Sequence, residues 1–264
     1  MCGIAGYSLS PDSDVDRTLA AQALLAGIAE RGADAVGYAH RCGDGEVVVH
    51  KQRTGASAIL DQLDLPDDAT QVLVHVRDYT KGHPTIEANN HPIRHGAVVG
   101  IHNGIIRNDD ELFADDGIER HAPEMTVDSE IIFALAERSR GRTTEALERL
   151  HGSMATAWMD EERRELVLAR GIARPLWIGS GRSGLFFAST RRALELVERY
   201  TSLRLRKREL DDGTLLAVRD GLVVARQRFQ PDLSFEEEPL PTVRAPHEGD
   251  FCLRRLATIA ARPQ

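Results

Sequence analysis

The sequence predicts an α+β protein in which two mainly antiparallel β-sheets are covered by helices. Strand-like segments both precede and follow each helix-like segment, so the chain does not show a simple βαβ alternation. Four strand-like segments follow one another closely between residues 154 and 188. Asp220-Gly221 separates two further strand-like runs and predicts a tight hairpin turn. These observations favour antiparallel pairing within each sheet.

The first half of the chain is expected to form four strands and one helix. Residues 3–8 are apolar and prone to form a strand, and residues 11–14 interrupt this run. Ser13 or Asp14 is expected to cap a helix that ends near Gly32, because apolar residues recur there at helical spacing. These apolar residues are Val15, Leu19, Ala23, Leu25, Ala26 and Ile28. The other expected strands are residues 46–51, 71–76 and 97–102.

The second half is expected to contain three helices and six strands before its composition changes. The predicted helices are residues 128–138, with Thr126 or Asp128 as the cap, residues 144–150 and residues 190–200. The predicted strands are residues 154–160, 165–169, 176–178, 185–188, 214–218 and 222–227. Prolines and an acidic run follow Gln230 and predict an extended tail over residues 231–264, with a possible short helix at 251–261.

The composition excludes several classes of protein. Of 264 residues, 42% are hydrophobic and 28% are charged, which is an ordinary globular balance. A formal net charge of −8 disfavours nonspecific binding to nucleic acid. No apolar run is long enough to span a membrane and no signal peptide is visible, so a cytoplasmic location is expected. The three cysteines, Cys2, Cys42 and Cys252, suggest no disulfide framework.

Histidines are concentrated between residues 75 and 102 and raise the question of a metal site. The cluster consists of His75, His83, His91, His95 and His102. These residues lack the short paired spacing that is typical of zinc ligands. We therefore interpret them as core or surface histidines and predict neither a metal ion nor another cofactor.

Cys2 is the most informative residue for function. An initiator methionine is removed when the next residue is small, and removal of Met1 would leave Cys2 with a free α-amine beside its thiol. A free cysteine has a pKa of about 8.5 and an α-amine a pKa of about 7.7–8.0. The amine can therefore take the thiol proton near neutral pH, as in enzymes with an N-terminal nucleophile. A cysteine at position two can also be incidental.

Three later segments supply groups that could act on an amide. Arg77 follows a predicted strand and could bind a carboxylate through two parallel N–H donors, or could be a solvated surface arginine. Asn103 and Gly104 also follow a strand and could donate to an oxyanion, or could form a hairpin turn. Asp128 could bind an ammonium group or could cap the helix that it precedes.

These segments resemble the class II glutamine amidotransferases of the N-terminal-nucleophile hydrolase superfamily. The resemblance begins with the opening string Cys2-Gly3-Ile4-Ala5-Gly6-Tyr7 and extends to about residue 200. It includes the strings at residues 31–37, 75–82, 90–92, 100–106 and 126–130, in the order that the family has. The family fold is a four-layer αββα sandwich whose N-terminal strand carries the nucleophile.

The resemblance assigns a role to each candidate residue. Cys2 is the expected nucleophile, and Asn103 with the N–H of Gly104 forms the expected oxyanion site. The predicted substrate-binding residues are Arg77 for the glutamine carboxylate, Asp128 for its ammonium group, and Asp78 and Gly104 beside them. Arg31 is expected to support the site.

The chain departs from the family pattern at two positions, one of them directly after Arg77. The family often has an aromatic residue at position 78, where this chain has Asp78, and position 35 is Ala in place of a frequent Ser. These departures leave the nucleophile, the oxyanion donors and the two charged residues in place. They leave open the shape of the pocket and whether glutamine is the only substrate.

We expect a domain over residues 2–230 that hydrolyses glutamine in a stand-alone form, without a fused synthase domain. A separate ammonia-accepting synthase is the predicted partner, homo-oligomerisation is possible, and the tail is a candidate contact unless it packs on its own domain. Two other functions remain open. One is hydrolysis of another γ-glutamyl amide or peptide, and the other is a non-catalytic regulatory or scaffold role.

Overall fold

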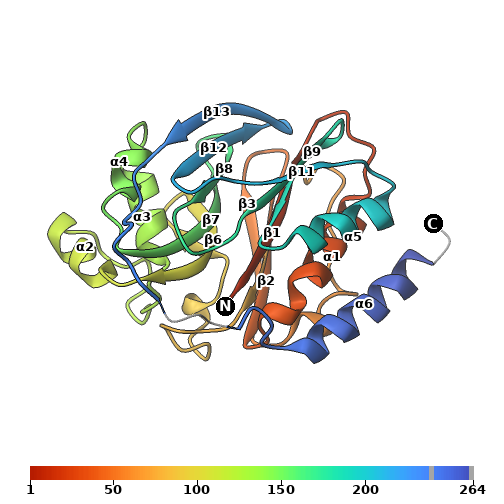
Figure 1. The fold of residues 1–264 in the computed structure, drawn as a ribbon, viewed down its shortest axis with the longest axis horizontal. Helices are drawn as coiled ribbons and strands as arrows, with labels where there is room; N and C mark the ends of the chain where they lie inside the picture. Colours follow the sequence, from red (N-terminus) through yellow and green to blue (C-terminus); the bar gives the residue numbers. More distant parts are fainter. Residues whose placement is uncertain (238–240, 262–264) are drawn as a thin grey trace.

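The computed structural model describes residues 1–237 and 241–261. Two antiparallel sheets stack face to face between two layers of helices (Figure 1). This arrangement confirms the predicted α+β fold class with its four αββα layers.

Sheet A has seven strands, and the N-terminal strand lies inside it. Its spatial order is β11 (Arg206–Glu209), β9 (Trp177–Gly181), β10 (Gly184–Ala188), β1 (Gly3–Leu9), β4 (Gln71–Arg77), β2 (Ala35–Arg41) and β3 (Val47–Gln52). In β1, Gly3 lies opposite Val76 of β4, and Ala5 lies opposite Ala188 of β10. The first residues of the chain are therefore fixed from both sides.

Sheet B has six strands. Its spatial order is β13 (Leu222–Arg228), β12 (Thr214–Arg219), β8 (Leu166–Arg170), β7 (Gly152–Asp160), β6 (Val98–Ile106) and β5 (Ile93–His95). Strands β12 and β13 form the hairpin predicted at Asp220-Gly221, and both residues have the positive φ angles that such a turn requires.

Helices cover the outer face of each sheet. The helices on sheet A are α1 (Arg17–Ile28), α5 (Arg191–Thr201) and, outside α1, α6 (Pro246–Ala260). The helices on the side of sheet B are α2 (Asp109–Asp116), α3 (Glu130–Arg138) and α4 (Thr143–Leu147). The short 3₁₀ helices η1 (Ala29–Arg31), η2 (Ala56–Ala58) and η3 (Glu87–Asn89) lie in the connections.

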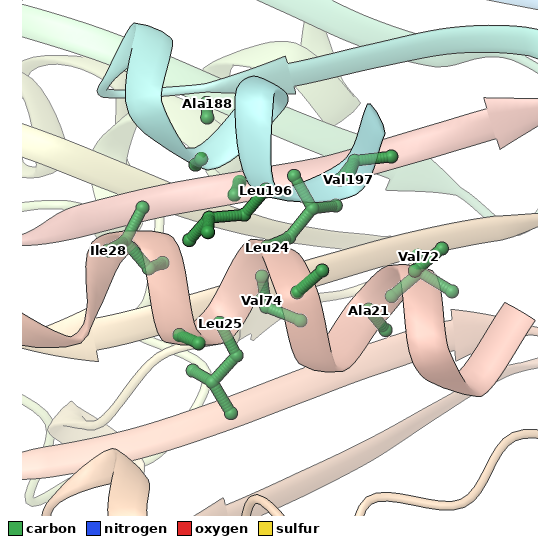
Figure 2. Close-up of a cluster of buried hydrophobic side chains, with 14 of the residues drawn as sticks. Ala21, Leu24, Leu25, Ile28, Val72, Val74, Ala188, Leu196 and Val197 are labelled. Atoms are coloured by element: carbon green, nitrogen blue, oxygen red, sulfur yellow. The ribbon is translucent and has the colours of Figure 1, made fainter. Parts of the chain in front are cut away.

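One apolar core joins α1 and α5 to sheet A. Figure 2 shows Leu24 and Ile28 of α1 on the same side of this helix as Leu196 of α5, and Val74 of β4 belongs to the same cluster. All four side chains are at most 8% exposed. Burial of each such side chain contributes about 1.5–3 kcal/mol relative to exposure. This core fixes the helical layer on which the N-terminal strand rests.

A second core lies between the two sheets and determines which way β6 presents its side chains. Val99 and Ile101 point into this core. Because side chains alternate along a strand, Asn103 shares their face and points toward sheet A. His102 points the other way, and its Nδ1 lies 2.8 Å from Ser129 Oγ near the start of α3.

Several elements differ from the expectations drawn from sequence. Strands β2, β5 and β11 and helix α2 were not predicted. Strand β2 is rich in Ala and Gly, which have weak strand propensity, yet it is buried between β4 and β3. The cap of α1 is Asp16, not Ser13 or Asp14. Helix α6 begins at Pro246, earlier than the predicted residue 251, because proline is well tolerated in a first helical turn.

Candidate active site

The candidate residues come together at one end of the two sheets. Cys2 directly precedes β1, Arg77 is the last residue of the adjacent strand β4, and Asn103 lies in β6 of the facing sheet. Asp128 lies two residues before α3. Four segments that are distant in sequence therefore supply the predicted groups.

The Cys2 residue is held through its backbone and its thiol. Arg31 is 3% exposed and donates from Nε to the carbonyl oxygen of Cys2 at 2.9 Å. The thiol donates to the carbonyl oxygen of Asp78, with 3.5 Å between the two heavy atoms. Burial raises the pKa of the thiol, while the nearby N-terminal amine and Arg77 act to lower it. The thiol therefore needs a base before it can react as a thiolate near neutral pH.

Met1 occupies the space beside Cys2. Its side chain is 8% exposed, and its amine forms an ion pair with the carboxylate of Asp78. Arg244, which precedes α6, also contacts this carboxylate, with its Nε 3.3 Å from Oδ1 and 3.2 Å from Oδ2. The predicted substrate-binding residue Asp78 thus faces the N-terminal amine and a cation from the C-terminal segment.

Asn103 is buried without a partner for its side-chain amide. The residue is 0% exposed, and neither Nδ2 nor Oδ1 has a hydrogen-bond partner among the described residues. Buried polar groups are normally paired, so a free amide at this position is available to a ligand. The alternative of an Asn-Gly hairpin turn was wrong, because β6 continues to Ile106.

Gly104 is required at its position by two constraints. Its φ angle is +156°, and a Cβ atom there would lie 1.9 Å from the carbonyl oxygen of Ser153 on β7. A side chain at residue 104 would therefore push β6 away from β7 and displace the neighbouring Asn103.

Arg77 is buried, so the alternative of a solvated arginine was wrong. It is 2% exposed, and Nη1 donates to Asn90 Oδ1 at 2.5 Å. Its Nη2 donates to the carbonyl oxygens of Lys81, at 2.9 Å, and Gly82. The guanidinium therefore organises the loop that follows β4, and burial lowers its pKa.

Asp128 is a buried carboxylate rather than a helix cap. It is 3% exposed, and its Oδ2 accepts a hydrogen bond from the backbone N–H of Ile106 at 2.8 Å. Ser129 is the N-cap residue of α3, so the capping alternative was wrong. Burial raises the pKa of Asp128 to about 6, and the nearby Asp109 acts in the same direction. A cationic group placed next to this carboxylate would favour its ionised form.

The structure adds contacts near the site that the sequence did not predict. Arg174 is 5% exposed and binds both carboxylate oxygens of Glu237, at 2.7 and 2.6 Å. Glu237 also accepts from Ser153 Oγ at 3.1 Å, and Ser153 lies in β7, the strand that pairs with Asn103 and Gly104. Glu237 belongs to the acidic run after Gln230, but no local pattern connects it or Arg244 to these distant partners.

The buried histidines lie behind the site as neutral groups. Burial lowers the pKa of His75 and of His102 to about 3. His75 stacks on His91 with 4.2 Å between the ring centroids, and His75 Nε2 lies 3.2 Å from the carbonyl oxygen of His102. Within residues 1–237 and 241–261, no three His, Cys, Asp or Glu side chains are placed to hold a metal ion. The same part of the chain contains no helix with the length and apolar character of a membrane span.

The chain is similar in sequence to known glutamine amidotransferases. Residues 75–196 match the family model described as "Glutamine amidotransferase domain". A glutamine–fructose-6-phosphate aminotransferase (isomerizing) from Thermus thermophilus is 31% identical and aligns with 100% of this chain and 43% of its own length. The corresponding protein of Listeria monocytogenes is 29% identical over 88% of this chain and 39% of its own length. The chain therefore spans less than half of the length of these relatives.

Solved structures share the fold at low sequence identity. Glutamine phosphoribosylpyrophosphate amidotransferase from B. subtilis has a TM-score of 0.68 at 20% identity, over 87% of this chain and 49% of its own. A glutamine aminotransferase class-II domain protein from Silicibacter pomeroyi has a TM-score of 0.55 at 20% identity, over 87% of this chain and 100% of its own.

Proposed function

The chain contains a class II glutamine amidotransferase domain, and from this premise we propose that it hydrolyses glutamine to glutamate and ammonia through a thioester on Cys2. The observation that carries the proposal is the unpartnered amide of buried Asn103 in the strand that faces β1, which begins directly after Cys2. An amide donor kept free in this way can stabilise a developing oxyanion.

The proposed reaction begins once Met1 has been removed. The α-amine of Cys2 takes the proton of the thiol, and the sulfur attacks the side-chain carbonyl carbon of glutamine. Asn103 and the N–H of Gly104 donate to the resulting oxyanion. The C–N bond then breaks, the nitrogen takes the proton held by the amine, and ammonia leaves.

Water completes the proposed cycle. It attacks the γ-glutamyl thioester, the C–S bond breaks, and the thiol regains its proton as glutamate forms. The sum is glutamine and water converted to glutamate and ammonia.

Two charged residues would hold the ends of the substrate. Arg77 would bind the α-carboxylate and Asp128 the α-ammonium group, each from a buried position that fixes its geometry. Positioning of a substrate in this way can lower the activation barrier by up to about 7–11 kcal/mol. We further propose a cytoplasmic location, where the thiol stays reduced, and an ammonia-accepting synthase as partner.

The test is glutamate release by protein from which Met1 has been removed. Cys2→Ala is expected to abolish glutamate release while the melting temperature stays near that of the wild type. Cys42→Ala is the matched control, because Cys42 lies at the far end of β2 and its loss should leave turnover unchanged. Trapping a wild-type adduct heavier by one glutamyl group would support the thioester. Turnover by Cys2→Ala would overturn the proposal.

A further inference from the structure

We propose that the space now filled by Met1 becomes the site of the leaving amine, with Asp78 as its receiving group. Arg244 positions Asp78 there and restricts the amine to a small size. This inference deepens the proposed function and rests on it.

The tetrahedral geometry of the reacting carbon determines where the amine leaves. Its four substituents are the Cys2 sulfur, the oxyanion, the carbon chain of the substrate and the amide nitrogen. The oxyanion points to Asn103 and Gly104, and the carbon chain runs toward Arg77 and Asp128. The nitrogen then takes the fourth direction, which we assign to the side of Met1. Asp78 contacts the thiol through its backbone oxygen, and Arg31 contacts both the Cys2 carbonyl oxygen and the sulfur of Met1.

Met1 shows the size and chemistry of that space. Its side chain is buried, with Sδ 4.0 Å from Nη2 of Arg31. Its amine pairs with the carboxylate of Asp78, which is 19% exposed. Removal of Met1 therefore vacates a space the size of one residue that ends at a carboxylate and already accepts an amino group. A departing ammonia that takes a proton from water would be bound there as ammonium.

Arg244 forms the outer wall of this space. The backbone N–H groups of Arg244 and Ala245 both donate to the carbonyl oxygen of Glu30 at 2.9 Å, which fixes the segment before α6. The Arg244 side chain is 45% exposed and contacts both oxygens of Asp78. It therefore covers part of this carboxylate, and in the proposed arrangement a bulky group on the amide nitrogen would run into it.

The experiment compares glutamine with γ-glutamylethylamide and γ-glutamyl-p-nitroanilide, using protein from which Met1 has been removed. Arg244→Ala is expected to raise kcat/KM for the substituted amides relative to glutamine by roughly tenfold or more, since pocket contacts with one or two carbons discriminate by about 10–200-fold. Arg244→Lys should restore part of the wild-type preference, because it keeps a cation beside Asp78. Arg255→Ala is the matched control, since Arg255 is similarly exposed but pairs with Asp61 on another face.

The outcomes separate this inference from the proposed function. Both the proposed function and this inference are supported if the wild type hydrolyses glutamine and only Arg244→Ala shows a raised ratio of kcat/KM for the substituted amides to kcat/KM for glutamine. Glutamine hydrolysis with the same ratio in wild type and Arg244→Ala overturns the inference and leaves the function standing. A raised ratio in Arg255→Ala as well would also overturn it, since the effect would not depend on Asp78. A wild type that releases no glutamate overturns the function and the inference with it.

Discussion

Arg31 donates a hydrogen bond from Nε to the carbonyl oxygen of Cys2 at 2.9 Å, so a buried cation fixes the backbone of the proposed nucleophile. The contact joins the 3₁₀ helix after α1 to the residue before β1. It gives Arg31 a positioning role that does not require contact with the substrate.

Replacement of Arg31 by Ala is therefore expected to lower kcat for glutamine hydrolysis by roughly 10- to 100-fold, because a small displacement of a reacting group can cost about 100-fold. The kcat of Arg31→Lys should lie between those of the wild type and Arg31→Ala. Single-turnover formation of the thioester measures the effect directly. An Arg31→Ala protein that forms the thioester at the wild-type rate would contradict this role.

Asn103→Ala is expected to lower kcat by about 10²–10³-fold, the range found when one oxyanion donor is lost. KM for glutamine should change little, because the donor acts mainly in the transition state. Steady-state kinetics separate the two constants. If KM instead rose by about 10²–10³-fold and kcat stayed the same, Asn103 would bind the substrate in its ground state.

Asp128→Asn is expected to stabilise the protein near neutral pH. Burial raises the pKa of Asp128 to about 6 from an ordinary value of 3.8. Between these values the native state keeps a proton that the unfolded chain has lost, so stability falls as pH rises through this window. The ionised carboxylate then costs on the order of 3 kcal/mol above pH 6, from about two pKa units at 1.36 kcal/mol each. Denaturant unfolding at pH 7.5 should show the gain, and the two proteins should converge below about pH 4.

The raised pKa of Asp128 also predicts that glutamine binding depends on pH. KM for glutamine should rise as pH falls below about 6, because protonated Asp128 no longer attracts the substrate ammonium group. Asp128→Asn should have a high KM that is flat over this range. A wild-type KM that does not change between pH 7.5 and 5 would argue against this contact.

Leu256→Ala tests whether α6 belongs to the folding unit. Leu256 is 0% exposed in the core that contains α1, so its truncation should cost about 2–5 kcal/mol of unfolding free energy. One cooperative transition with a lower midpoint is expected. Exposed Thr258→Ala on the same helix is the control and should shift the midpoint little. If the substitution affected only a separate early transition and left the main midpoint unchanged, α6 would unfold independently of the rest of the chain.

Much of the fold could be predicted because its signals are local. The branched residues of β4 and β6 and the Asp220-Gly221 turn were recognised from short windows of sequence. Strand β2 was missed because small residues can form a strand when neighbours on both sides supply the pairing. Its conformation depends on β4 and β3 rather than on its own side chains.

The candidate site was predicted in part for the same reason. Cys2, Asn103 and Arg77 belong to short strings with recognisable chemistry, and the fold brings them to one end of the sheets. Glu237 and Arg244 reach the site only through the path of the C-terminal segment. Such long-range contacts leave no periodicity in the sequence.

The central place of β1 has a consequence for maturation. Both neighbours of β1 are synthesised after it, β10 more than 170 residues later, and in the folded protein Met1 is buried with its amine held by Asp78. An aminopeptidase needs an extended, accessible terminus. If the proposed function holds, removal of Met1 must therefore precede the pairing of β1 with its neighbours, and a molecule that folds with Met1 attached is expected to be inactive.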